Sequence, residues 1–127
     1  MKSNVRSVIA YAAWRCISGK QSTGVFDSSQ SKHIPMSGSV TPDHLDIYDQ
    51  DKSCHFSGDA LNSKFSLYNA ADRHHVTLNI KGDRFSGHDY GSSSNFSGKA
   101  QGNFLNLYDC EDGTSVAFRM EGPPATP

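Results

Sequence analysis

Aromatic side chains recur at every twentieth position over much of the chain, and rings at a fixed spacing can stack on flat ligands. The members are Tyr48, Tyr68, His88 and Tyr108, and Phe26 has the same place in an earlier, imperfect copy of the repeat. An exposed aromatic face offers a large contact area at little cost in side-chain entropy, which suits sugar rings. The pattern predicts a ligand-binding column. The alternative is that these rings cover the rim of the fold or contact a neighbouring subunit.

A column of acidic and amide side chains follows the aromatic column by one residue. It contains Asp49, Asn69, Asp89 and Asp109, and carboxylate oxygens are ligands for divalent cations. Calcium loops, however, place Asp, Asn and Gly at closer spacing, and the sequence has no Asp-x-Asp-x-Asp-Gly run. An Asp or Asn that begins a turn accepts hydrogen bonds from amides two residues further on. We expect these residues to begin turns and to hold no metal.

Histidine and cysteine side chains do not form a recognisable catalytic or metal-binding motif. His74 and His75 are adjacent and would point to opposite faces of a strand, although His55 shares a column with His75. A nucleophile requires a base and an orienting group within reach, and the linear sequence gives neither Cys54 nor Cys110 such partners. The carboxylate pair of a glycosidase would have to interrupt the repeat, and none does so. We therefore predict no catalytic residue, no metal and no cofactor.

The length and composition predict one domain of modest size. The chain has 127 residues, of which 35% are hydrophobic and 20% are charged, and a formal net charge of −1. This charge gives no electrostatic basis for binding nucleic acid or an anionic membrane, and no apolar run approaches the ~20 residues of a membrane helix. The three cysteines favour free thiols in a reducing, cytoplasmic compartment, with export left open because residues 8–13 form a short apolar run.

Each copy of the twenty-residue repeat contains two turns. The first is a two-residue loop with Gly or Asn at a position that suits positive φ, as in Asn62-Ser63, Gly82-Asp83 and Gly102-Asn103. The second turn is longer and begins at the Asp/Asn column, as in the segment 89–93. Two-residue loops form hairpins, so each copy of the repeat is expected to be a pair of antiparallel strands.

The loops also determine which residues face each other across neighbouring strands. Gly58 would lie opposite Leu67, and Leu78 opposite Gly87, so that a glycine faces a large aliphatic side chain. One face of the sheet would be apolar and the other polar, as in antiparallel sheets with one buried face. We predict an all-β antiparallel meander of about ten strands, forming a closed or nearly closed barrel or a curled sheet. A β-solenoid is the alternative.

Both ends of the chain depart from the repeat. Residues 1–122 are expected to form the single β-repeat domain, and residues 123–127 a disordered tail. Residues 1–17 are ambiguous between helix and strand, because apolar positions from Val5 to Cys16 share one helical face while Val8-Ile9-Ala10-Tyr11 is similar to residues 45–48 of the repeat. We favour a strand on this internal similarity, with Trp14 at one end of the core. Pro35, in a two-residue insertion, indicates an edge strand or a bulge.

Short motifs built on Ser-Gly and Tyr-Asp recur from about residue 18 to residue 122. They are Phe56-Ser57-Gly58, Leu67-Tyr68-Asn69, Asp89-Tyr90-Gly91-Ser92-Ser93, Phe96-Ser97-Gly98 and Leu107-Tyr108-Asp109. This pattern resembles small bacterial β-repeat proteins in which Ser-Gly and Tyr-Asp signatures alternate, although Asn69 and His88 depart from the Tyr-Asp signature. The resemblance implies a repetitive β fold and transfers no catalytic residue.

These features predict a non-enzymatic β domain that binds carbohydrate, or another small molecule, through a Tyr-lined polar face. The residues expected to form this face are Phe26, Tyr48, Tyr68, His88 and Tyr108. The alternative is a structural or assembly module that forms a homo-oligomer through a sheet edge or through the aromatic column. Light scattering and a glycan array distinguish the two classes. A protein that stays monomeric at all concentrations and retains glycans favours the binding domain.

Overall fold

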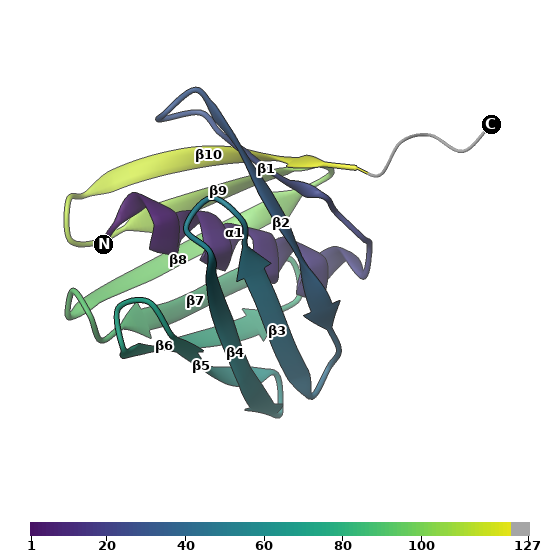
Figure 1. Ribbon diagram of the computed structural model, residues 1–127, viewed down its shortest axis with the longest axis vertical. Helices are drawn as coiled ribbons and strands as arrows, with labels where there is room; N and C mark the ends of the chain where they lie inside the picture. The colour runs from purple at the N-terminus through teal and green to yellow at the C-terminus, as the bar shows by residue number, and fades with distance from the viewer. Residues whose placement is uncertain (123–127) are drawn as a thin grey trace.

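One helix precedes ten strands along the chain. The computed structural model describes residues 1–122, and the tail expected at residues 123–127 lies outside the described residues (Figure 1). The helix α1 spans Ser3–Ser18. The strands are β1 (Gly24–Asp27), β2 (Lys32–Val40), β3 (His44–Asp49), β4 (Cys54–Leu61), β5 (Lys64–Asn69), β6 (His74–Lys81), β7 (Arg84–Asp89), β8 (Ser94–Gln101), β9 (Phe104–Asp109) and β10 (Thr114–Glu121).

The strands form a closed antiparallel barrel. Each strand pairs with the strands before and after it along the chain, and β1 pairs with β10 to close the sheet. This meander confirms the predicted fold class and excludes the β-solenoid. Because every strand has two hydrogen-bonded neighbours, the ten described strands leave no free edge. The sheet-edge route to a homo-oligomer therefore has no basis in this part of the chain.

The predicted strand register is confirmed. Gly58 pairs with Leu67 and Leu78 pairs with Gly87, as the two-residue loops required. The backbone in these loops has positive φ, for example 55° at Asn62, which matches the twist of the flanking strands. The apolar face expected from the register points inward and forms the core.

Glycine is required in these pairs for a second reason, in addition to the volume of the facing side chain. A Cβ atom on Gly58 would lie 1.9 Å from the carbonyl oxygen of Ser66, and one on Gly98 would lie 2.0 Å from that of Asn106. The neighbouring backbone therefore leaves no space for any side chain at these positions. Such close approach is typical of the bends at which a small barrel curves.

Residues 3–18 form a helix inside the barrel, so the strand favoured for this segment was wrong. The ribbon of α1 runs through the space that the strands enclose (Figure 1). Its central residues Val8–Ala13 are fully buried, and Gly19 ends the helix with a φ of 68°. The helical spacing of the apolar residues from Val5 to Cys16 indicated the correct structure, whereas the four-residue similarity to the repeat did not. Within residues 1–122, no helix has the length and apolar character needed to cross a membrane.

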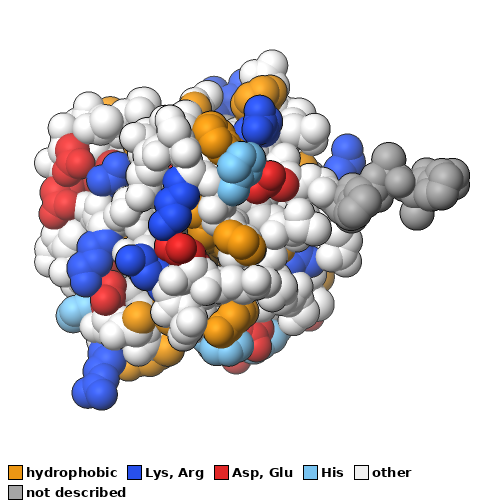
Figure 2. Space-filling view, turned by 45° about the horizontal axis from the view of Figure 1, so that its top comes forward, with side chains coloured by type: hydrophobic (Ala, Val, Ile, Leu, Met, Phe, Trp, Pro, Cys, Tyr) orange, Lys and Arg blue, Asp and Glu red, His pale blue; other side chains and the backbone are white. Residues whose placement is uncertain are grey.

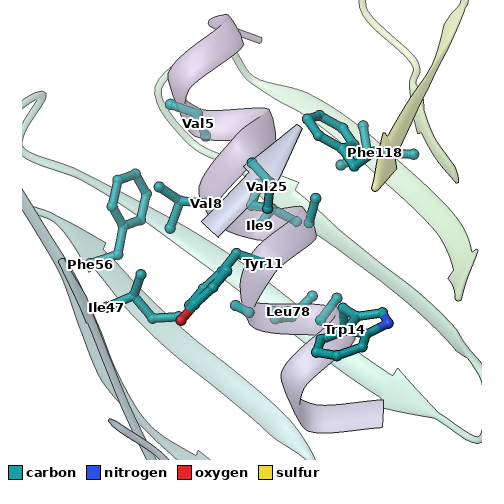
Figure 3. Close-up of a cluster of buried hydrophobic side chains, with 14 of the residues drawn as sticks. Val5, Val8, Ile9, Tyr11, Trp14, Val25, Ile47, Phe56, Leu78 and Phe118 are labelled. Atoms are coloured by element: carbon teal, nitrogen blue, oxygen red, sulfur yellow. The ribbon is translucent and has the colours of Figure 1, made fainter. Parts of the chain in front are cut away.

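Side chains of α1 contact the barrel wall in several directions. Phe56 and Ile47 lie on one side of the helix and Phe118 on the other (Figure 3). Trp14 is buried and its indole Nε1 donates to the carbonyl oxygen of Gly102 (2.8 Å), which confirms its expected position at one end of the core. A ten-stranded barrel encloses more space than its own inward side chains fill, and the helix fills the remainder.

Strand β2 is not an edge strand, which excludes one of the two interpretations of Pro35, the other being a bulge. The residues from Lys32 to Pro35 pair with β1, and those from Met36 to Val40 pair with β3. Pro35 lies where the strand changes partner, and its carbonyl oxygen accepts a hydrogen bond from the amide of Gln50 (3.2 Å). The missing N–H of proline is tolerated at this position because the pairing changes there.

Candidate functional site

The acidic and amide column lies at one end of the barrel and begins the long turns there. All four members are buried. In each of them the side-chain Oδ1 accepts a hydrogen bond from the amide two residues further on, for example Asp89 Oδ1 from Gly91 N at 3.0 Å and Asp109 Oδ1 from Glu111 N at 3.0 Å. This confirms the turn-starting role predicted from the sequence.

Asp49 differs from its counterparts in its electrostatic setting. Burial raises the pKa of its carboxyl, and the backbone amides of Lys52 and Asp51 oppose that shift. Its Oδ1 accepts from both amides, whereas its Oδ2 is buried and has no hydrogen-bond partner among residues 1–122. The position therefore uses one carboxylate oxygen and leaves the other unsatisfied.

Three acidic side chains, Asp109, Glu111 and Asp112, lie close enough together to suggest a cation site. Cationic groups of the chain already occupy this position. Arg6 places its Nε 3.2 Å from Asp109 Oδ2 and its Nη2 3.3 Å from Asp112 Oδ2, and the Met1 ammonium contacts Asp109 and Glu111. These two cationic groups offset most of the charge of the three carboxylates, so the cluster gives little support for a metal ion.

The aromatic column lies on the outer surface, on alternate strands of the closed barrel. Phe26 is on β1, Tyr48 on β3, Tyr68 on β5, His88 on β7 and Tyr108 on β9. Since these strands go around the barrel, the five rings point in different directions and do not form one platform. Only a ring with suitable neighbours on adjacent strands can contribute to a binding site.

Four of these five rings pack against another ring of the chain. Three pair with the histidine seven residues later: Phe26 with His33, Tyr48 with His55, and Tyr68 with His75, with centroids 4.7 to 5.1 Å apart. The fourth, His88, packs edge-on against Tyr90 at 4.6 Å. Figure 2 shows two places where a histidine lies beside hydrophobic and acidic side chains. We did not predict these pairs from the sequence, although the seven-residue spacing was visible there.

Tyr108 is the member of the column without such a partner in residues 1–122. Its neighbours on the adjacent strands are Ser97 and Ser115, and the residue is 42% exposed. It lines a shallow hollow of about 490 Å³ on the outer surface, together with Asn79, Ser86, Asn106, Phe85 and Gly98. The hollow exists because serines and a glycine stand between longer side chains. It brings one aromatic face together with several hydrogen-bonding groups.

A row of basic side chains forms one border of this hollow. Lys81, Arg84 and Lys99 are cross-strand neighbours on β6, β7 and β8 and are exposed. Asp83 offsets part of this charge, with its Oδ2 3.7 Å from Lys99 Nζ. The border is therefore net positive and suits an anionic or strongly polar ligand.

Titratable groups with shifted pKa values do not gather in one cavity of the described chain. Burial raises the pKa of the Cys16 thiol to about 11 and also raises the pKa values of Tyr11 and Cys54. Cys16 and Asp49 line separate cavities at different places in the fold. Grouped, shifted pKa values are the usual indication of acid–base catalysis, and this arrangement does not provide it.

Comparison with models of protein families, with curated proteins and with solved structures found no match. The described chain is a ten-stranded antiparallel barrel with an internal helix and an open hollow beside Tyr108 on its outer surface.

Proposed function

We propose that this protein is a non-enzymatic binding module that holds a carbohydrate in the outer hollow beside Tyr108. One observation supports this most directly: the Tyr108 ring is exposed between two serines and lies within a hollow of about 490 Å³. An exposed aromatic face stacks on the apolar side of a sugar ring, while neighbouring hydroxyl and amide groups bond to the sugar hydroxyls.

The charge of the hollow narrows the class of sugar. Lys81, Arg84 and Lys99 lie along one border, and guanidinium and ammonium groups bind carboxylate and sulfate groups with charge-assisted hydrogen bonds. Asn79 and Asn106 supply neutral donors and acceptors on the same surface. A saccharide that carries a carboxylate or a sulfate group matches this combination best.

The other members of the aromatic column contribute less under this proposal. The rings of Phe26, Tyr48 and Tyr68 each pack on a histidine, and His88 packs on Tyr90. A ring that already packs on another ring has part of its surface in that contact, although Tyr68 and Tyr108 are similarly exposed, at 39% and 42%. Tyr68, which is 39% exposed and has its own histidine, is therefore a matched control for Tyr108.

The test is a glycan array followed by calorimetric titration with any glycan retained. We expect the wild-type protein to bind an acidic saccharide, Tyr108→Ala to weaken binding by about tenfold or more, and Tyr68→Ala to leave the affinity within about twofold. Arg84→Gln should weaken binding of the acidic saccharide and reduce its dependence on salt. An array without any retained glycan, or equal losses for the two tyrosine variants, would contradict the proposal.

Self-association through the aromatic column is the competing function. The same exposed ring that suits a sugar also suits the surface of a second copy. Light scattering over a range of protein concentrations separates the two, because an oligomer that is dispersed by Tyr108→Ala favours assembly. A monomer at all concentrations favours ligand binding.

A further inference from the structure

The cavity beside the C-terminal turn of α1 contains a buried cation. Arg15 lies in that turn and is 7% exposed. Its Nη1 donates to the carbonyl oxygen of Gly38 (2.7 Å) and to the hydroxyl of Tyr11 (3.3 Å), and its Nη2 donates to Gln21 Oε1 (3.3 Å). Its Nε is buried and has no hydrogen-bond partner within residues 1–122.

All the acceptors around Arg15 are uncharged. No carboxylate of residues 1–122 lies within salt-bridge distance of it, whereas Arg6, in the same helix, pairs with Asp109 and Asp112. Buried charges in proteins are generally paired, because removing a charge from water is costly. The partial negative charge at the end of α1 helps to hold Arg15 there, but it does not satisfy the Nε–H.

Arg15 lines a cavity of about 220 Å³. Its walls are largely apolar and come from the loops and strands at this end of the barrel, with Val40, Pro42, Phe65 and Ile80, and from Cys16 of α1. The Cys16 thiol has a pKa of about 11 because of its burial, so it is neutral at pH 7 and does not repel an anion. Drug-sized ligands usually occupy ~300–1,000 Å³, so this cavity suits a smaller molecule.

We propose that this cavity binds a small organic carboxylate, with its carboxylate on Arg15 and its short apolar body against Val40, Phe65 and Ile80. The ligand would supply the anion that residues 1–122 do not provide and would pair with the guanidinium of Arg15. The site is separate from the outer hollow, because the two share no lining residue.

A titration with three probes, followed by NMR of the backbone amides, tests the proposal. The probes are hexanoate, hexanol with the same body and no charge, and acetate with the charge and almost no body. We expect hexanoate to bind saturably and to shift the amides of Cys16, Gly19 and Val40, with hexanol and acetate at least about tenfold weaker. Failure of hexanoate to saturate, or equal binding of hexanol, would overturn the proposal.

Two variants and one control locate the binding. Arg15→Met removes the cation and Val40→Phe fills the cavity while keeping Arg15, and each should weaken hexanoate binding about tenfold or more. Leu61→Phe changes a 77% exposed side chain that does not line the cavity, and it should leave the affinity within about twofold. If Arg15→Met does not fold, hexanoate binding by Val40→Phe tests the proposal instead. Unchanged hexanoate binding in the folded Val40→Phe variant would overturn the proposal. Tyr108→Ala should bind hexanoate normally, which separates this site from the sugar site.

Discussion

At the scale of single residues, Asp49 and Asn69 show how two different side chains behave at equivalent positions of the repeat. Both begin a long turn and accept hydrogen bonds from the next amides through Oδ1. Asn69 also donates from Nδ2 to Asp72 Oδ2 (3.1 Å), whereas Asp49 Oδ2 is buried without a hydrogen-bond partner in the described part of the chain. The turn therefore requires one acceptor oxygen and not a negative charge.

We expect Asp49→Asn to stabilise the protein at pH 7 by on the order of 1 kcal/mol, because it keeps the acceptor and removes an unsatisfied buried charge. Burial raises the pKa of Asp49 above its ordinary value of 3.8. The folded state therefore holds this proton more tightly than the unfolded state. The contribution of the group to stability is greatest below pH 3.8 and falls as the pH rises through the raised pKa.

Urea unfolding of both proteins between pH 3.5 and pH 7 measures this effect. The stability gained by Asp49→Asn should grow as the pH rises and vanish at the acidic end. The reciprocal change Asn69→Asp is the control, and it should destabilise the protein at pH 7 because it places a carboxylate beside Asp72. A loss of stability in Asp49→Asn at pH 7 would contradict the argument.

At the scale of strands, the pairing of a glycine with a large side chain sets how each hairpin fills the core. Leu67 is fully buried opposite Gly58. The carbonyl oxygen of Ser66 leaves no space for a side chain at Gly58. A void created at Leu67 therefore cannot be filled from the facing position. At other glycines of this kind, a ring from the adjacent hairpin occupies the space above the glycine. The Phe85 ring does so at Gly98.

Leu67→Ala should destabilise the protein by about 2–5 kcal/mol, because it removes buried methyl groups and leaves a cavity. Leu61→Ala, at a side chain that is 77% exposed, is the matched control and should change stability by no more than about 0.5 kcal/mol. Denaturant titration measures both. A loss smaller than about 1 kcal/mol for Leu67→Ala would show that the core collapses around the void.

At the scale of the whole molecule, the helix and the barrel depend on each other. The central residues of α1 are fully buried, and its neighbours Val25, Leu78 and Phe118 face the barrel interior. Without the helix these side chains would line an apolar space open to water. A barrel of this kind is therefore expected to require its helix in order to fold.

A chain that lacks residues 1–19 should show no cooperative unfolding transition, and a synthetic peptide of residues 1–19 added in trans should restore one. Urea unfolding followed by circular dichroism measures this, because filling the interior is the step that stabilises the barrel. A peptide carrying Ile9→Asp, which would bury an unpaired charge, should not restore the transition. A shortened chain that unfolds as cooperatively as the full chain would show that the wall is stable alone.

The repeating segment was predictable because its structure depends on local chemistry. Two-residue loops with Gly or Asn determine a hairpin and its register, and the period of two in the apolar residues determines which face is buried. Asp49 and its counterparts begin turns through bonds to residues two positions away. These interactions lie within one hairpin or one turn, so the sequence by itself determined the strands, their pairing and the role of the acidic column.

Contacts between distant segments determined that residues 3–18 form a helix. They also determined which ring of the aromatic column can contact a ligand. Residues 3–18 are a helix inside a barrel because the strands close around them, and closure is a pairing of β1 with β10 across almost the whole chain. Closure also spreads five periodic rings around a circle. It leaves Tyr108 between two serines, while histidines pack against Phe26, Tyr48 and Tyr68. A repeat in sequence makes these positions equivalent, and only their different neighbours in the closed sheet make them unequal.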